Sequence, residues 1–203
     1  MRMQINFDPE DVARVKLLLD DIDANRVMIR AINDTLAGVN TDAARAVYAD
    51  LNLTQTRIKE DFSIRRAYTG NVNGAFTATG RPVNLASFTG SRMTTRGLSV
   101  KIKRAGTRVT FRHGFLWNRT TRTGESAATA FQREWQGART NATTQLPWKQ
   151  MGQQYRLPLE TMTGPRIEDI LSKPEVIGPL EIAGGDRLEA AVDHELEYIL
   201  SRH

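Results

Sequence analysis

The chain of 203 residues contains no cysteine, which excludes disulfide bonds, thiolate chemistry and cysteine-ligated zinc sites. It also lacks any apolar run of about 18 residues, so we expect no membrane-spanning helix and no membrane partner. Residues 1–9 do not have the apolar core of a signal peptide. The sequence therefore predicts a protein that is made in the cytoplasm of its cell.

No recognisable set of catalytic residues is present either. The three histidines (His113, His194 and His203) belong to different contexts, and the run Asp193-His194-Glu195 would point in three directions on a helix. There is no phosphate-binding loop and no Gly-x-Ser-x-Gly turn. Glu168-Asp169 reads as a pair of first-turn helix acids. We expect no enzymatic activity, no cofactor and no metal site.

Acidic residues are missing from one long stretch, because none occurs between Phe62 and Gly124. Residues 62–159 hold 16 Lys and Arg against 2 Asp and Glu, whereas residues 1–61 hold 8 against 11 and residues 160–203 hold 4 against 10. Three interpretations remain open at this point. The basic middle faces a polyanion such as DNA, or it meets the acidic parts of another copy, or the acidic ends fold back on it within one chain.

The centre of this basic stretch, residues 98–112, alternates apolar and polar side chains on both sides of Ala105-Gly106. Such alternation predicts a β-hairpin with an apolar face and a basic face. Like charges that face each other across strands are destabilising, which suggests an anionic partner, although a solvated polar face is the alternative. The predicted pairs are Ile102 with Val109, Val100 with Phe111, Lys103 with Arg108, and Lys101 with Thr110.

The N-terminal third is predicted to be helical. Asp8-Pro9 is typical of a helix start, and a second helix is expected from about residue 24 to residue 52. We expect an interruption of that helix at Gly38 to Asn40. A short helix should follow Thr54 and bring Ile58 and Phe62 together at a spacing of four.

From residue 68 the composition changes to that of strands and turns. Strands are expected at 73–79, 83–88 and 128–135, with polar connections at 89–96, 118–126 and 136–145. Pro165 should open a short helix that ends before Pro174. The final helix should begin after a hinge at Gly184-Gly185, with Asp186 and Glu189 as a capping box. Its apolar face would carry Leu188, Val192, Leu196 and Ile199.

Together these patterns predict an α+β fold in one domain, residues 1–203. A helical part (1–67) and acidic C-terminal helices (161–203) would pack around a small antiparallel sheet in a basic β region with extended polar loops (68–160).

The order of these parts resembles the minor tail protein Z family of long-tailed bacteriophages and prophages. The resemblance spans roughly residues 20 to 200, and it depends on Ile64-Arg65-Arg66-Ala67, Thr129 to Arg133, and Tyr155 to Glu160 running into Gly164-Pro165. It implies a virion protein of the tail or neck that acts in tail completion or head–tail joining. It also implies a ring of subunits around the DNA passage, in contact with other tail or neck proteins.

This reading assigns roles to two groups of charged residues, with a sequence-independent nucleic-acid-binding module as the alternative function. Subunit contact is expected at Glu189, Asp193 and Glu197. Contact with DNA or a partner is expected at Lys101, Lys103, Arg104, Arg108, Arg112, Arg119 and Arg122.

Overall fold

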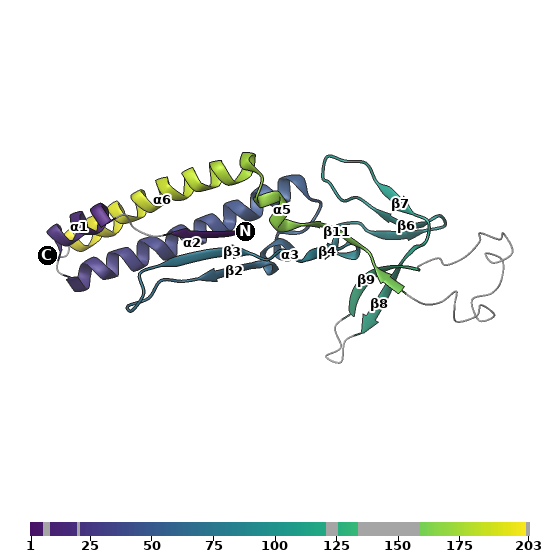
Figure 1. Cartoon of the computed structure of the whole chain (residues 1–203), viewed down its shortest axis with the longest axis horizontal. Helices are drawn as coiled ribbons and strands as arrows, with labels where there is room; N and C mark the ends of the chain where they lie inside the picture. Colours follow the sequence, from purple (N-terminus) through teal and green to yellow (C-terminus); the bar gives the residue numbers. More distant parts are fainter. Residues whose placement is uncertain (6–8, 20, 121–125, 134–158, 202–203) are drawn as a thin grey trace. The chain divides into compact units, whose positions relative to one another are not determined.

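The computed structural model describes residues 1–5, 9–19, 21–120, 126–133 and 159–201 (Figure 1). Within these residues, five α-helices accompany several small antiparallel sheets, which confirms the predicted α+β class. The predicted loop at 136–145 lies outside the described residues, as does the centre of the loop predicted at 118–126.

The chain gathers into two compact units that do not follow the predicted boundaries at 67 and 160. Unit 1 comprises Met1–Asp50, Gln55–Arg81 and Arg166–His203, and unit 2 comprises Leu51–Thr54 and Pro82–Pro165. The division separates the charges. Unit 2 has 13 Lys and Arg against 3 Asp and Glu, and unit 1 has 15 against 20.

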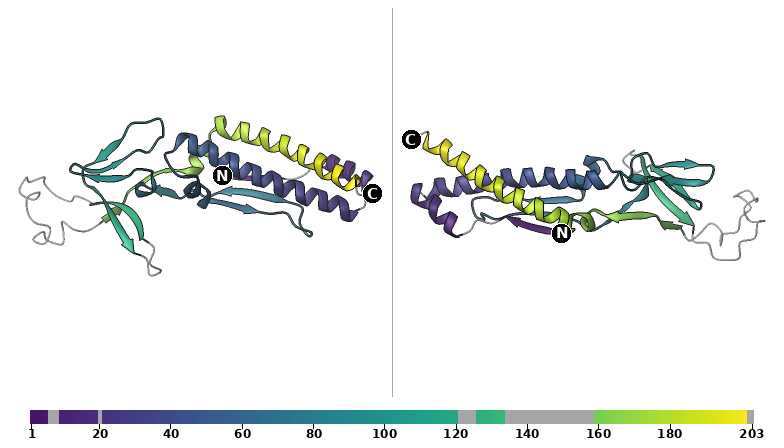
Figure 2. Two further views of the ribbon diagram at one scale, coloured as in Figure 1. Left: turned by 180° about the vertical axis from the view of Figure 1, so that it is seen from behind. Right: turned by 90° about the horizontal axis from the view of Figure 1, so that it is seen from above.

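The helices of unit 1 are α1 (Pro9–Leu18), α2 (Asp21–Asp50), α3 (Gln55–Glu60), α5 (Ile167–Leu171) and α6 (Pro174–Leu200). Helices α2 and α6 lie side by side in all views (Figures 1 and 2). Ile199 on α6 is buried with Val27 on α2 and Val15 on α1, and Val192 and Leu196 pack against this cluster. The predicted apolar face of the final helix is therefore confirmed for these three residues.

Several predicted helix ends were wrong, because tertiary packing outweighs local propensity. Helix α2 continues through Gly38 to Asn40, and α6 continues through Gly184-Gly185, so neither the interruption nor the hinge exists. Asp186 is inside α6 and caps nothing at a helix start. Gly184 is buried, and a Cβ there would lie 3.5 Å from Cγ2 of Val39 on α2. A small residue at this position allows α6 to approach α2 closely.

Two shorter elements also differ from the prediction. Helix α3 ends at Glu60, so Phe62 belongs to strand β2 and not to the same helix as Ile58. Helix α5 begins after Arg166, whereas Pro165 lies in strand β11. The proline's fixed φ suits an extended backbone as well as the first turn of a helix, so the sequence alone does not separate the two.

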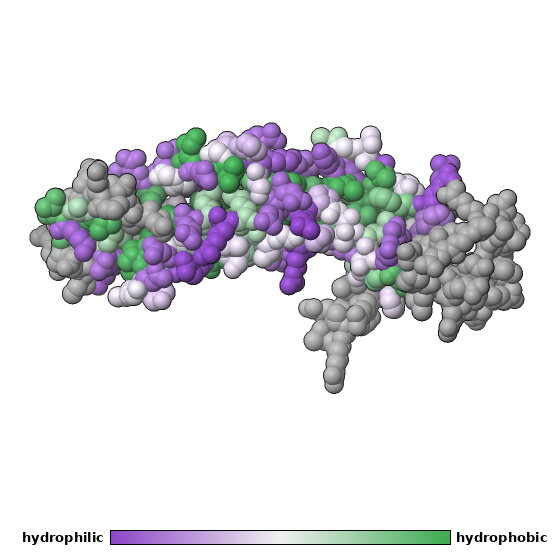
Figure 3. Space-filling model, in the orientation of Figure 1, coloured by the Kyte–Doolittle hydropathy of each residue, from purple (hydrophilic) through white to green (hydrophobic). Residues whose placement is uncertain are grey.

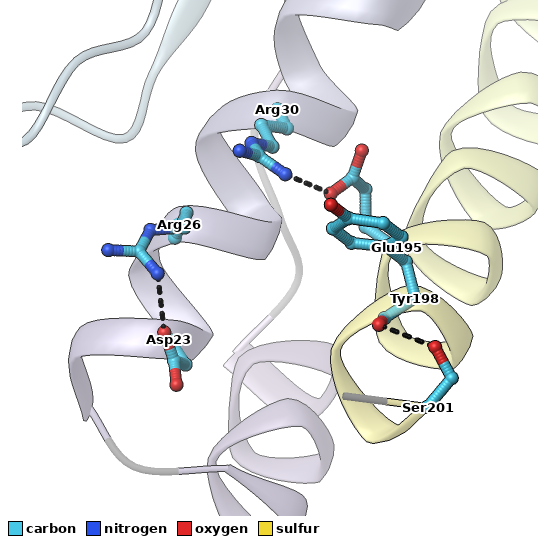
Figure 4. Close-up of polar contacts among 6 residues, drawn as sticks. All are labelled: Asp23, Arg26, Arg30, Glu195, Tyr198 and Ser201. Carbon is cyan, nitrogen blue, oxygen red and sulfur yellow. Dashed lines mark hydrogen bonds and ion pairs between the residues drawn. The ribbon is translucent and has the colours of Figure 1, made fainter. Parts of the chain in front are cut away.

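Ion pairs add to the packing of α2 against α6. Arg30 donates a hydrogen bond to Glu195 at 3.0 Å (Figure 4), and the contact raises the pKa of the guanidinium. Arg187 pairs with Asp42 at 2.6 Å, and Lys173 pairs with Asp50 at 3.2 Å. Within unit 1, part of the acidic charge is thus neutralised by the unit's own cations.

The sheet of unit 1 has the order β1-β3-β2, formed by Arg2–Ile5, Gly74–Ala78 and Phe62–Arg65, and both pairs are antiparallel. One face packs on α2, where a Cβ on Gly74 would lie 2.5 Å from Cγ2 of Ile32. Phe76 is fully buried on that face and meets Phe62 edge-on, with ring centroids 5.0 Å apart. The glycine at the start of β3 gives the helix room to lie on the sheet.

Unit 2 contains short strands in three sheets, in the orders β5-β6-β7, β10-β9-β8 and β11-β4. Residues 83–88, predicted as one strand, form the end of β4 and a 3₁₀ turn, and the segment predicted as a polar connection contains β5. The strands are β4 (Pro82–Asn84), β5 (Arg92–Thr94), β6 (Gly97–Val100), β7 (Val109–Phe111), β8 (Gly114–Thr120), β9 (Ser126–Arg133), β10 (Leu159–Thr161) and β11 (Thr163–Arg166).

The side chain of Asn84 links two elements of unit 2. Its side-chain oxygen accepts hydrogen bonds from the backbone amides of Ala86, at 2.9 Å, and of Ala130, at 2.8 Å. The first bond caps the 3₁₀ turn and the second attaches that turn to β9. Phe88 and Leu98, which follow Asn84 in the sequence, are fully buried.

On the face shown in Figure 3, hydrophobic residues occur in small groups among hydrophilic ones. None of the helices in the described ranges is both long and apolar enough to span a bilayer.

Candidate functional site

The predicted hairpin exists, but its register and length were wrong. Strands β6 and β7 pair antiparallel with Leu98 opposite Phe111 and Val100 opposite Val109, a shift of two residues from the predicted alignment. Because the shift is even, the two faces keep their residues. However, all of β6 is buried while Val109 is 45% exposed, so the hairpin does not divide into an apolar and a basic face.

The pairing stops at Val100 because the next residues find another partner. The backbone amide of Asn52 donates to Ile102 at 2.9 Å, and its side chain donates to the carbonyls of Lys101 and Thr89. Leu51 forms a β-bridge with Lys103. The short segment 51–54 thus takes the place predicted for the second hairpin strand, and Lys103 does not face Arg108.

We call residues 101–108 the basic loop, because they carry four of the predicted contact residues. Lys103 and Arg108 are exposed, and Lys101 and Arg104 are half-buried. Arg108 donates to the carbonyl of Gly90 at 2.7 Å, and Arg104 donates to the carbonyl of Leu53 at 3.5 Å. These acceptors orient the guanidinium groups without neutralising their charge.

The remaining predicted cations are not part of this loop. Arg112 follows β7, at the opposite end of the sheet, and it is exposed. Arg119 lies on β8, opposite Ala127, and Arg122 lies outside the described residues. Three residues of strand, about 10 Å at 3.4 Å per residue, separate Arg112 from the basic loop. The predicted group of seven is therefore at least two groups.

Three cations of the basic loop are not neutralised by carboxylates in the part of the chain that the structure describes. Within the described residues, none of Lys101, Lys103 and Arg108 forms an ion pair with Asp or Glu. Glu160 is the single acidic residue of unit 2 whose position is described, and its carboxylate accepts a hydrogen bond from Gln132 at 3.0 Å.

A surface of negative charge, opposite in sign to the basic loop, lies on α6. Glu189, Asp193 and Glu197, at spacings of four, are all exposed and form no ion pair with a described cation. We call these three residues the acidic α6 face. Their neighbour Glu195 points to α2 and pairs with Arg30 (Figure 4). Acids at a spacing of four repel each other, at a cost of about 0.2–0.5 kcal/mol per pair.

An aromatic group on the sheet β10-β9-β8 was not predicted as a unit. Phe131 lies opposite Phe115, with ring centroids 6.1 Å apart, and the centroid of Trp117 is 5.9 Å from that of Phe131. Trp117 is 53% exposed. The sequence signal was the spacing of two between Phe115 and Trp117, which puts both rings on one face of a strand.

No group of His, Cys, Asp and Glu suited to a metal ion occurs in the described part of the chain. The carboxyl pKa of Glu168 is lowered, because its carboxylate accepts a hydrogen bond from the α-ammonium group of Met1. That contact joins the start of β1 to α5 and is structural.

Comparisons with known proteins found no matching family, no matching curated protein and no matching solved structure.

Proposed function

We propose that this chain is a structural subunit of a bacteriophage tail or neck, acting in tail completion or head–tail joining as a ring around the DNA passage. Support for the tail assignment comes from the resemblance in element order and in the segment that leads into Gly164-Pro165. Support for the ring comes from one observation. Lys103 and Arg108 of the basic loop and all three acids of the acidic α6 face are exposed, and none of them forms an ion pair with a described residue of the same chain.

A ring requires two different patches that meet between neighbouring copies. Opposite charges on those patches fix the orientation of the copies and disfavour like-to-like pairing. We therefore assign the basic loop of one copy to the acidic α6 face of the next. The other partners are tail and neck proteins at the two ends of the ring, together with contact to DNA that does not depend on its sequence. The proposed role includes neither an enzymatic activity nor contact with a membrane.

Charge reversal tests this interface. Changing Asp193→Lys and Glu197→Lys should weaken self-association by about 100-fold or more, because like charges across an interface cost several kcal/mol. The variant Lys101→Glu/Lys103→Glu should show the same defect. Sedimentation velocity at low and high salt measures both.

Mixing the two reversed variants should restore assembly, since each then offers the charge that the other needs. The matched control is Asp34→Lys/Asp169→Lys, which reverses two exposed acids of unit 1 elsewhere and should leave assembly unchanged. A wild-type chain that stays monomeric at high concentration and fails to join tail proteins would remove the ring proposal.

The tail assignment needs its own test. Mass spectrometry of purified particles from a strain that carries the gene should find the chain in the virion. Deletion should leave heads and tails unjoined, and a plasmid copy should restore joining. Particles that lack the chain yet infect normally would contradict the assignment.

A second candidate function is sequence-independent binding of nucleic acid. The observation in its favour is the exposed Trp117 beside Phe131, because aromatic rings of this kind stack on bases. Contact of the basic loop with three or four phosphates predicts a slope of about −3 in log K against log salt. Lys101→Ala/Lys103→Ala should reduce that slope by about 2, as each lost phosphate contact removes about 1. Binding that is insensitive to salt would exclude this function.

A further inference from the structure

Two turns of unit 2 lie next to each other and border an open hollow, whose lining includes Arg112 of the predicted contact residues. One turn, residues 95–96, joins β5 to β6, and the other, residues 112–113, joins β7 to β8. The register brings them to the same end of the sheet, since Thr94 is opposite Gly97 and Leu98 is opposite Phe111. Residues 93–97 and 112–114 line a volume of about 330 Å³. Small-ligand pockets begin at about 300 Å³.

The two turns pack closely against each other. Gly97 has a φ of +123°, and a Cβ there would lie 2.2 Å from the carbonyl oxygen of Phe111. A Cβ on Gly114 would lie 3.0 Å from Cβ of Leu98. The hydroxyl of Thr94 closes the first turn by donating to the carbonyl of Gly97 at 2.8 Å. The backbone of one turn therefore packs on the backbone of the other, and the site is preorganised for a ligand.

The charged side chains around this hollow are both positive. Arg96 and Arg112 line it together with His113, and no carboxylate of the described residues does. Neither arginine forms an ion pair among the described residues. Guanidinium groups present paired donors that match the oxygens of phosphate, and the hydroxyl of Thr95 adds a neutral donor at the same place.

We propose that this two-turn hollow binds a phosphate group, with Arg96 and Arg112 as its charged ligands. The ligand is a phosphate ester, either a small free one or a phosphodiester of a nucleic-acid strand. The site is separate from the basic loop and does not depend on the ring. A monomeric chain that still binds phosphate would remove the ring and leave this site intact.

The test is an NMR titration of the full ¹⁵N-labelled chain with sodium phosphate, at an ionic strength held constant with sodium chloride. Saturable shifts are expected in the amides of residues 94–97 and 112–114. The variant Arg96→Gln/Arg112→Gln should bind phosphate at least about tenfold more weakly, since charged hydrogen bonds are the strong ones. Arg112→Lys keeps the charge but loses the paired donors and should bind with intermediate strength.

The matched control is Arg92→Gln, an exposed arginine of the same sheet that does not line the hollow, and it should bind like the wild type. A short oligonucleotide without terminal phosphates identifies the source. If it competes with phosphate, the ligand is a nucleic-acid backbone, and if it does not, the ligand is a small phosphate ester. No saturable shift, or equal weakening in Arg92→Gln, would overturn the proposal.

Discussion

Substitutions in helix α6 can test whether packing or local helix propensity decides the fold of unit 1. Its middle contains Gly184-Gly185, which the sequence alone predicts to be a hinge. Within the described residues, left-handed φ values occur at Gly90 and Gly97 and not at this pair. If the helix is continuous, Gly185→Ala should stabilise the protein.

The magnitude follows from the surroundings of each glycine. A Cβ on Gly185 would meet nothing within 4 Å, so the substitution gains helix propensity without a clash. Glycine is less favourable than alanine inside a helix by about 0.8–1.0 kcal/mol. For a chain of this size, about 1 kcal/mol corresponds to a rise in Tm of roughly 2–4 °C. Gly178 is a poorer choice because it precedes Pro179, and a β-carbon before proline disfavours helix.

Leucine substitutions at the two neighbours form a matched pair. Gly185→Leu faces open space and should be close to neutral or stabilising, whereas Gly184→Leu is forced into Val39 on α2. Overpacking of this kind costs about 1–3 kcal/mol. Urea unfolding followed by circular dichroism at 222 nm reports on the helices, all of which in the described chain belong to unit 1. A destabilised Gly185→Ala, or equal effects of the two leucines, would mean that the helix bends at this pair.

Three further predictions concern other parts of the fold. Phe76→Ala should cost about 3–5 kcal/mol, measured by the same unfolding assay, because the fully buried ring leaves a cavity. Gly97→Ala should prevent β6 from packing, since its Cβ would lie 2.2 Å from a backbone oxygen. Gly90→Ala would meet only a side-chain nitrogen, at 2.8 Å, and should fold with a smaller loss of stability. Near-UV circular dichroism compares the two variants, and equal losses of signal would contradict this difference. Glu168 has a lowered pKa in the folded state, so its pair with the ammonium of Met1 stabilises above the unfolded pKa and is lost as pH falls through the folded pKa. Glu168→Gln should therefore be less stable than the wild type at pH 7 and equal to it near pH 2, and a difference independent of pH would exclude the ion pair.

Much of the fold follows from patterns that are local in sequence. The spacing of Val192, Leu196 and Ile199 predicts the buried side of α6, and the composition of residues 73–79 predicts β3. The predicted breaks at Gly38 to Asn40 and at Gly184-Gly185 were wrong because they depended on the average helix propensity of glycine. At Gly184, the absence of a side chain serves the contact with α2 and does not mark a break.

The candidate surfaces show where local patterns stop being informative. Alternation in residues 98–112 is equally compatible with the predicted register and with the observed one, since a shift of two residues keeps each side chain on its face. The choice is made by Asn52, about fifty positions earlier, which binds the backbone of Lys101 and Ile102. That contact ends the ladder at Val100 and makes the following residues a loop.

The same shortening separates Arg112 from the basic loop and leaves it beside Arg96 instead. Charge counting along the sequence identifies the cations correctly, but it cannot say which of them share a site. The two groups of cations lie at opposite ends of one sheet. They can bind two different anions, or two parts of a single polyanion. Phosphate titration of the Arg96→Gln/Arg112→Gln and Lys101→Glu/Lys103→Glu variants separates these cases. Independent sites require that each double substitution leaves the other site's affinity unchanged, whereas a shared polyanion requires that both weaken the same binding event.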